Sequence, residues 1–429
     1  MIKNSNCLLL ALWVLFMLSG AGDAVASIGG VVGGCVRMKE IRGQLTDAAG
    51  SLHRADRVDA DGAVPVPEVV IRFTFSGAEG PDQKIDPVFV RADAGGCYSA
   101  KWTDWTRDAF PARARMAILW SHSDVAGQWN SMPPTVFSIH GATGQPLGNS
   151  RSVELTASTT IDRTLAGGDA AAAYATAWEF FDRVVRGGNG GRSELLVEAM
   201  RGIHIFIGLP SLSGVWGIAP TQNEVLMAAR TPVLTPWTVA HELGHLVTWN
   251  AMGLRVAPLL PTDYAGLIWD FTTRESERAA FLEGMASFFA MAWMWDRTAA
   301  APTLYRGGTR FDVEAASGTG DDRGAAPFTC ATVSAGWERP FCNAAALWDV
   351  FDAPAGDDDP MTARTQADIV DTLDRYPDGC SPQAANGCSN ELGFAGLNHN
   401  DFLRNFRPAA DRGVMSSIYK ANGLAGGAP

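Results

Sequence analysis

The segment Thr235-Pro236-Trp237-Thr238-Val239-Ala240-His241-Glu242-Leu243-Gly244-His245 decides how the second half of this chain is interpreted. Thr235 can cap a helix that begins at Pro236, because a proline at the first helical position needs no backbone donor. His241 and His245 then lie one turn apart, and their imidazoles project from the same face of the helix. Two neutral imidazole nitrogens arranged in this way can bind one zinc ion at about 2.0–2.1 Å. The segment therefore predicts part of a metal site.

Glu242 follows the first histidine and is rotated about 100° from it around the helix. Its carboxylate is therefore expected beside a metal held by the two histidines, outside the set of direct ligands. A carboxylate in that place can take a proton from a water molecule activated by zinc. We predict Glu242 to be a general base, because a purely structural metal site has no use for this group.

A catalytic zinc site needs a third protein ligand and an open position for water. Glu283 is the preferred candidate, because it is the only acid in the apolar helical stretch 279–290. A carboxylate in such surroundings is costly unless it meets a cation. Small residues of this stretch are expected to allow a close approach to the histidine helix: Gly284, Ala286, Ser287 and Ala290. Other acids stay open as third ligands: Asp263, Glu275 and Glu277.

The composition is that of a folded, acidic protein. The 429 residues are 47% hydrophobic and 19% charged, which is enough for two or three domains with their own cores. The formal net charge of −12 argues against a nucleic-acid partner, because such proteins carry basic surfaces. A peptide or protein substrate is the expected partner, and the oligomeric state stays open.

The N-terminus is typical of a secretory signal. Lys3 precedes the apolar run Cys7–Leu18, and Ala24-Val25-Ala26 supplies small residues for cleavage. Residues 1–26 are therefore predicted to be a signal peptide, too short in its apolar part for a stable anchor. No later stretch is apolar for long enough to cross a bilayer, so no transmembrane anchor is expected. The predicted location is secreted or periplasmic.

The cysteines agree with export. An even number remains after signal removal, which indicates disulfides in an oxidising compartment. Short spacings favour Cys330–Cys342 and Cys380–Cys388, and these pairs leave Cys35–Cys97. In the alternative, Val32-Gly33-Gly34-Cys35 resembles a lipoprotein processing site, which would place a lipid on Cys35 and leave Cys97 unpaired.

Three regions follow the signal. Residues 27–125 are expected to form an all-β sandwich, because short strands alternate with turn residues at 41–46, 67–75, 88–91, 97–102 and 115–120. Residues 126–160 are expected to be a linker with extra strands. Residues 161–429 are expected to be α+β and mainly helical. Strands are predicted there at 203–209 and 225–229, and helices at 168–186, 235–250, 274–296, 342–351, 362–376, 399–406 and 411–422.

The metal-site helices carry a family resemblance. His241-Glu242-Leu243-Gly244-His245, followed by a helical Glu283-Gly284-Met285-Ala286, resembles the gluzincin metallopeptidases and the Glu-Gly-x-Ala signature of their aminopeptidase-N branch. The resemblance implies a zincin-like metallopeptidase domain, with His241, His245 and Glu283 as zinc ligands and Glu242 as general base. The separation of His245 from Glu283 is longer than usual. Because the motif that recognises a free amino terminus is absent, an endopeptidase is favoured. The first region resembles transthyretin-like sandwiches at Gly43–Asp47 and Ala94–Tyr98.

The implied mechanism needs further groups. A tyrosine or histidine usually stabilises the oxyanion, and four residues stay open for this role: Tyr264, Tyr305, Tyr376 and His399. Asp349 or Asp352 could orient a zinc-bound histidine, or simply flank its helix. The strand at 225–229 is placed like the edge strand that pairs with extended substrates in gluzincins.

Two other functions stay open. In the first, the chain is a surface-binding or adhesive protein, in which the sandwich binds the partner and the zinc site is structural or inactive. In the second, the zinc site hydrolyses a substrate that is not a protein, although no sugar- or lipid-specific motif supports this.

Overall fold

The computed structural model describes residues 28–39, 63–76, 87–104, 113–145, 148–154, 158–165, 169–187, 193–209, 217–221, 223–228, 236–252, 271–299, 302–306, 309–318, 327–333, 335–352, 364–374, 399–406 and 411–424. These residues form both β-sheets and helices, which confirms the α+β character of the fold. Several predictions fall outside the described residues: the signal peptide, the strand at 41–46, Asp263, Tyr264, Tyr376 and the pair Cys380–Cys388.

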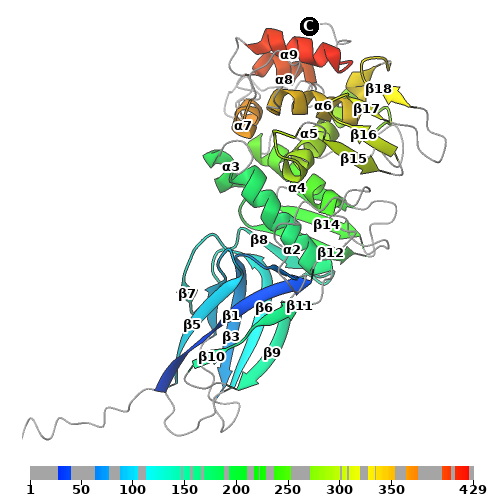
Figure 1. The fold of residues 1–429 in the computed structure, drawn as a ribbon. Helices are drawn as coiled ribbons and strands as arrows, with labels where there is room; N and C mark the ends of the chain where they lie inside the picture. The colour runs from blue at the N-terminus through cyan, green and yellow to red at the C-terminus, as the bar shows by residue number, and fades with distance from the viewer. Residues whose placement is uncertain are drawn as a thin grey trace, which may run out of the picture.

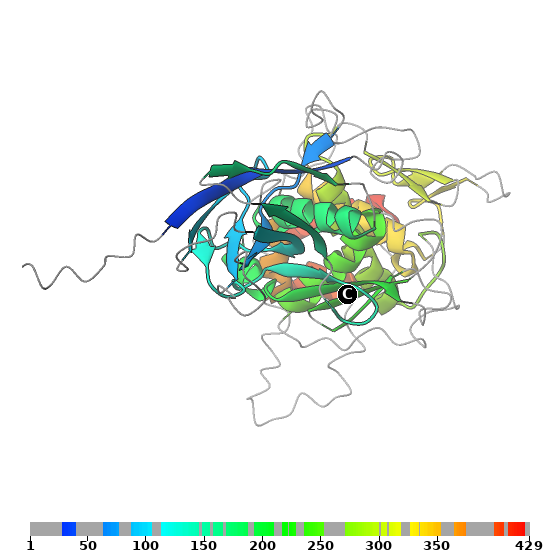
Figure 2. The same ribbon diagram turned by 90° about the horizontal axis from the view of Figure 1, so that it is seen from below.

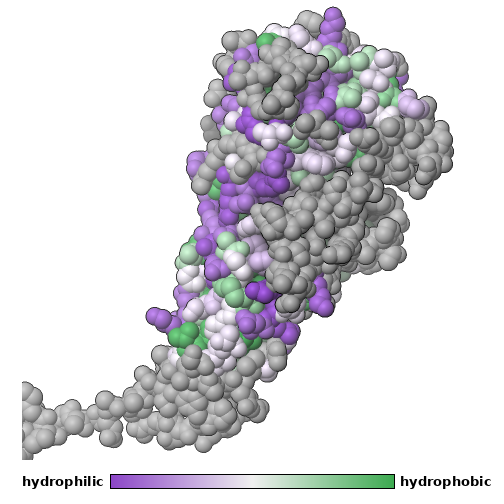
Figure 3. Space-filling view, in the orientation of Figure 1, coloured by the Kyte–Doolittle hydropathy of each residue, from purple (hydrophilic) through white to green (hydrophobic). Residues whose placement is uncertain are grey.

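The described part of the chain is elongated. Figure 1 shows strands β1, β3, β5 and β9 at one end and helices α8 and α9 at the other. Figure 2 looks along the long direction of the molecule, from the strand-rich end. In this view the strands overlie the helices, so the two parts are stacked end to end. The face in Figure 3 is mainly hydrophilic over the middle of the molecule. Among the described residues, the large hydrophobic side chains that are exposed are Val31, Val125, Met132 and Ile218.

The strand-rich end is a sandwich of two sheets. The first sheet is built on β1, with these members: β1 (Ile28–Lys39), β2 (Ala63–Pro65), β5 (Cys97–Asp104), β10 (Ser158–Thr160) and β11 (Arg163–Leu165). Strand β3 (Val69–Ser76) of the second sheet packs on β5 through two ring contacts. Phe73 lies 5.7 Å from Tyr98, and Phe75 lies 6.1 Å from Trp102. The predicted disulfide Cys35–Cys97 links neighbouring strands β1 and β5.

The second sheet, here called the main sheet, runs on beyond the sandwich. Its strand order is β13-β14-β12-β8-β6-β3-β4-β7, and β9 pairs with β6. The strands not yet given are β4 (Val88–Arg91), β6 (Arg113–His122), β7 (Gln128–Trp129), β8 (Phe137–His140), β9 (Gly148–Glu154), β12 (Ile203–Leu209), β13 (Gly217–Thr221) and β14 (Glu224–Ala228). Strand β8 pairs with β6 on one side and β12 on the other, so strands from all three predicted regions share this sheet. The domain limits themselves stay predictions.

The prediction that the strand at 225–229 forms the sheet edge is wrong, because one further strand lies outside it. Strand β14 covers the described residues of the predicted segment, but it pairs with β12 on one side and β13 on the other. The described edge is therefore β13. Its sequence is Gly217-Ile218-Ala219-Pro220-Thr221. Proline occurs in strands mainly at sheet edges, so this sequence does not predict a strand from its residue pattern alone.

Some of the described helices contact the main sheet directly, and the others pack on those helices or on one another. These helices are α2 (Asp169–Phe180) with a π-helical turn (Phe181–Val185), α3 (Glu194–Ala199), α4 (Pro236–Ala251), α5 (Glu277–Met294), α6 (Pro340–Phe351), α7 (Gln366–Asp374), α8 (His399–Asn405) and α9 (Arg412–Ala421). Tyr174 of α2 contacts Trp120 of β6 and Phe137 of β8, so this helix packs on the main sheet where β6 meets β8. Helix α5 is buried along its length from Ala279 to Trp293.

A small sheet, not predicted from the sequence, lies beside α6. It contains β15 (Thr303–Arg306), β16 (Thr309–Asp312), β17 (Ser317–Gly318) and β18 (Phe328–Thr329). The predicted disulfide Cys330–Cys342 joins the residue after β18 to α6. Within the described ranges, no helix combines the length and the apolar character needed to span a membrane.

Candidate metal centre

The metal-site helices α4 and α5 cross at a glycine. A Cβ atom built on Gly244 would lie 2.6 Å from the carbonyl oxygen of Ala286, so the two backbones are in direct contact there. The predicted close approach is therefore present. Gly284 does not contribute to it as expected, because a Cβ at this position would meet Asn343 and Pro340 of α6. Gly284 instead lets α6 approach α5 on another face.

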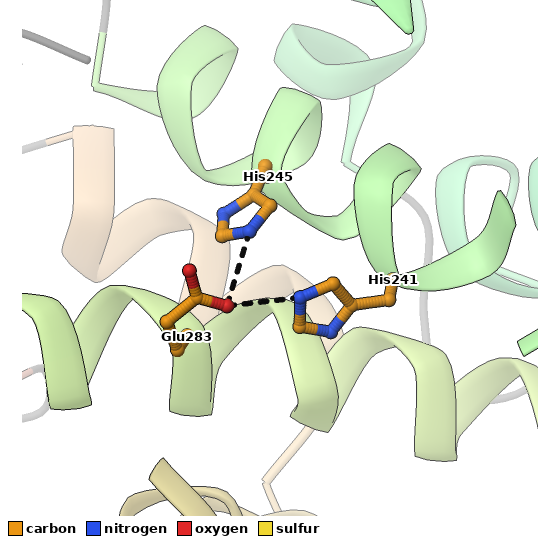
Figure 4. Close-up of side chains that lie close together, drawn as sticks. All are labelled: His241, His245 and Glu283. Carbon is orange, nitrogen blue, oxygen red and sulfur yellow. Dashed lines mark hydrogen bonds and ion pairs between the residues drawn. The ribbon is translucent and has the colours of Figure 1, made fainter. Parts of the chain in front are cut away.

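This crossing brings His241, His245 and Glu283 together (Figure 4). Nε2 of His241 lies 3.0 Å from Oε2 of Glu283, and Nε2 of His245 lies 3.4 Å from the same oxygen. All three side chains are buried, and one ligand atom of each lies within 4.8 Å of the others. Of the described histidines, cysteines and acids, these form the group of three that could hold a metal ion.

The spacing of these atoms fits a first-row metal. Ligands placed tetrahedrally at about 2.0–2.2 Å from zinc lie about 3.3–3.5 Å from one another. The two measured separations are close to this value, and two imidazoles with one carboxylate are a ligand set that zinc accepts. Glu275 and Glu277, the described alternatives, are not members of the group.

Glu283 and His245 each stabilise the charged form of the other. Burial alone would raise the pKa of Glu283, but the charge of His245 and hydrogen bonds from both histidines hold this pKa well below its usual range. Burial would lower the pKa of His245, but the neighbouring carboxylate of Glu283 raises it. Glu283 is therefore ionised in this buried place, and such a carboxylate attracts a cation.

Two neighbours hold the histidine rings in place. The hydroxyl of Ser287 lies 3.3 Å from Nδ1 of His241, on the ring nitrogen away from Glu283. The indole of Trp249 stacks on His245, with ring centroids 5.8 Å apart. Neither role is predicted from the sequence above. The signal was available, because each residue follows a metal-site residue by four positions and so shares its helix face.

Glu242 faces the edge of the main sheet. A Cβ atom built on Gly217 of β13 would lie 2.9 Å from both Cγ and Oε1 of Glu242. The carboxylate therefore rests against the backbone of the edge strand, and a glycine is what makes room for it. The structure thus places the predicted general base between the metal-site helix and β13.

The remaining predicted groups have other neighbours. Oδ2 of Asp349 accepts a hydrogen bond from Asn422 at 2.6 Å, which ties α6 to α9. Asp352 is the residue that caps the C-terminus of α6. His399 of α8 lies against the ring of Tyr419 of α9, and Tyr305 lies in β15. None of these observations tests their predicted roles, which stay predictions.

Comparison with known proteins adds little to this geometry. No protein family matches the chain, and no curated protein matches it. Among solved structures, part of the chain is similar to a 9R-lipoxygenase from Cyanothece, with 11% sequence identity and a TM-score of 0.15. The similar part covers 35% of this chain and 22% of the lipoxygenase. A likeness this weak carries no conclusion about fold or function.

Proposed function

We propose that this chain is an exported zinc-dependent metallopeptidase of the gluzincin type. The observation that carries the proposal is the buried group of His241, His245 and Glu283, with Glu242 beside it and against the edge strand β13. A metal site that serves only stability has no need for an additional carboxylate that lies against the edge strand of the described sheet. A peptidase needs both features.

Zinc is the metal we propose for this group. Two imidazoles and one carboxylate are the donors of several catalytic zinc sites, which keep a further position open. Zinc would polarise the substrate carbonyl and lower the pKa of a water molecule to about 7. Nε2 of each histidine and a carboxylate oxygen of Glu283 would hold it.

Glu242 would move the protons of the reaction. Its carboxylate would accept a proton from the attacking water and then deliver that proton to the nitrogen of the leaving amine. Because Gly217 lacks a side chain, the Glu242 carboxylate can lie between the metal group and the edge strand. Ser287 would keep His241 oriented, by way of the ring nitrogen that does not face the metal.

Strand β13 suggests how a substrate would lie. An edge strand presents backbone donors and acceptors that an extended peptide can pair with. Ile218 is 41% exposed, so the strand carries an apolar side chain that a substrate could contact. An extended peptide on this edge would pass the Glu242 carboxylate, which suits cleavage within a chain and favours an endopeptidase.

Export is part of the proposal. The disulfides Cys35–Cys97 and Cys330–Cys342 are compatible with an extracellular or periplasmic protein. The first disulfide also leaves no thiol on Cys35 for a lipid, which weighs against the lipoprotein alternative.

Cleavage profiling tests the proposed function. Purified zinc-loaded protein is incubated with a broad peptide library beside Glu242→Gln, which keeps the shape and removes the base. We expect hydrolysis to fall by at least about 10²-fold in the variant, with zinc content and melting temperature unchanged. Zinc-loaded wild-type protein that cleaves nothing would favour the surface-binding alternative. Equal cleavage by both proteins would remove Glu242 from the mechanism.

A further inference from the structure

A second cluster of polar side chains, two of them imidazoles, lies on the main sheet, on strands other than the one that contacts Glu242. Ser138 and His140 belong to β8, and His204 belongs to the parallel neighbour β12, where it is paired in register with Ser138. Phe137 of β8 packs against α2 through Tyr174. Side chains alternate between the faces of a strand, so the three polar residues project from the face opposite α2.

Three polar atoms of this group converge. The hydroxyl of Ser138 lies 2.6 Å from Nε2 of His140 and 3.1 Å from Nδ1 of His204. The two ring nitrogens lie 3.0 Å apart. The separation of the two ring nitrogens is near the value of about 3.3 Å expected between ligands of one tetrahedral metal ion, whereas the Ser138 hydroxyl is hydrogen-bonded to Nε2 of His140 and would have to move away from it to bind the same ion. The distance between the two ring nitrogens equals the one between Nε2 of His241 and Oε2 of Glu283.

The ring of His140 is already in the form that binds a metal. Its Nδ1 lies 3.2 Å from the carbonyl oxygen of Gly144, and a carbonyl only accepts hydrogen bonds. Nδ1 therefore carries the hydrogen, and the lone pair of Nε2 points at the Ser138 hydroxyl and Nδ1 of His204. A backbone carbonyl on the other ring nitrogen is the usual partner of a metal-binding histidine.

We propose that Ser138, His140 and His204 form a second site for a divalent transition-metal ion such as Zn²⁺. The two imidazoles would be the principal ligands, because imidazole suits zinc, copper and nickel. The hydroxyl of Ser138 would be a weaker ligand. Glu224 of β14 is in register with His204 on its other side and adds a negative charge to the same row of residues. This site is independent of the proposed peptidase activity.

An ion in this site would link two neighbouring strands of the main sheet. Strand β8 pairs with β12 through four registered residue pairs, and β12 and β14 lead to the edge strand beside Glu242. An ion shared by His140 and His204 would clamp β8 to β12 at this junction. Because it binds the folded state, the ion would raise the melting temperature in proportion to the logarithm of its concentration.

Zinc titration of the metal-free full-length chain tests the proposal. Binding is followed against a chromophoric chelator, with elemental analysis of the dialysed protein. We expect wild-type protein to bind two ions, the His241→Ala/His245→Ala variant to keep one, and the His140→Ala/His204→Ala variant to keep the other. Each single change, His140→Ala or His204→Ala, should weaken the second site by more than about 100-fold, the upper range for losing only an outer-shell partner. His53→Ala is the control for adventitious imidazole binding and should change nothing.

Two results would overturn the proposal. One is a His241→Ala/His245→Ala variant that is folded by circular dichroism and binds no zinc. The other is a His140→Ala/His204→Ala variant that still binds two ions. If the His140→Ala/His204→Ala variant does not fold, the His241→Ala/His245→Ala variant decides alone. Its zinc content and the rise of its melting temperature with zinc are then the two readouts. A chain that binds two ions but cleaves no peptide would contradict the proposed function and leave this site intact.

Discussion

Gly217 and Glu242 are in contact across the boundary between the main sheet and helix α4. A Cβ atom on Gly217 would come within 2.9 Å of Oε1 of Glu242, a distance that real Cβ atoms do not adopt. Position 217 therefore controls where the proposed general base can lie. The contact also makes β13, and not β14, the strand that lies against the Glu242 carboxylate.

Gly217→Ala is expected to displace the Glu242 carboxylate without removing the metal. Hydrolysis should fall by at least about 10-fold, because misplacing a general base costs part of the 10²–10⁴-fold it contributes. Zinc content should stay at the wild-type level, because no ligand is changed. The readout is kcat/KM on a peptide substrate together with elemental analysis.

A double-variant cycle gives the control for this prediction. If Gly217→Ala acts through Glu242, then adding it to Glu242→Gln should cause little further loss, because the two changes share one effect. Independent, multiplicative losses would show that Gly217 acts through the substrate or the strand itself.

Glu283→Gln should remove zinc from the site formed with His241 and His245. The change keeps the size of the side chain but deletes the charge that the two buried histidines face. Zinc affinity should fall by more than the 10–100-fold that outer-shell changes cost. Glu275→Gln and Glu277→Gln are matched controls on the same chain segment. Unchanged zinc in Glu283→Gln, with loss in either control, would contradict the ligand assignment.

Ser287→Ala should weaken zinc binding moderately. It removes the hydroxyl that lies 3.3 Å from Nδ1 of His241 and frees the ring to rotate. A loss of about 10–100-fold in zinc affinity is expected for such an outer-shell partner. Ser287→Thr keeps a hydroxyl and should recover most of the affinity. Equal losses in both variants would point to packing at the helix crossing instead.

Several parts of this structure follow directly from local sequence. Helix α4 begins at Pro236, as predicted, because a proline there fits the first helical turn. Glu283 was recognised as a ligand candidate by its place among apolar neighbours, and it is buried. Strands β4 and β12 have the predicted limits, since apolar runs of that length with turn residues around them have few other interpretations.

Other parts depend on contacts that no local pattern contains. The order of strands in the main sheet is set by pairing between residues far apart in the sequence, as between β6 and β8 and between β8 and β12. The contact of Gly217 with Glu242 depends on the same long-range arrangement. Gly284 was expected to face α4, and its true neighbour α6 depends on how a third helix packs.

The pH dependence of stability should reflect His122. This ring is fully buried, and Arg186 donates a hydrogen bond to its Nε2 at 2.8 Å, which requires the unprotonated nitrogen. Burial, reinforced by the charge of Arg186, lowers the pKa of His122 from 6.5 to about 4. The unfolded chain therefore binds a proton more readily than the folded one between these values.

The expected result is a free energy of unfolding that is unaffected by this group above pH 6.5 and falls as the pH drops towards 4. The shift corresponds to a loss of roughly 3 kcal/mol. Urea unfolding at several pH values compares wild type with His122→Gln, whose amide can still accept from Arg186. The variant should lose less stability over the same range. Identical slopes for the two proteins would contradict a neutral buried His122.

Removing residues 27–125 should unfold the rest of the chain. The deletion takes away β3, β4 and β6, and it leaves β8 without a partner on one side. It also removes Trp120 and the carbonyl of Pro67, which contact the ring and the hydroxyl of Tyr174 in α2. The fragment from residue 126 onward would then expose the apolar face of a sheet and one side of α2. We expect it to be insoluble or, if soluble, to lack a cooperative thermal transition by circular dichroism. A fragment that melts cooperatively and binds zinc like the full chain would show instead that the metal centre belongs to an independent folding unit.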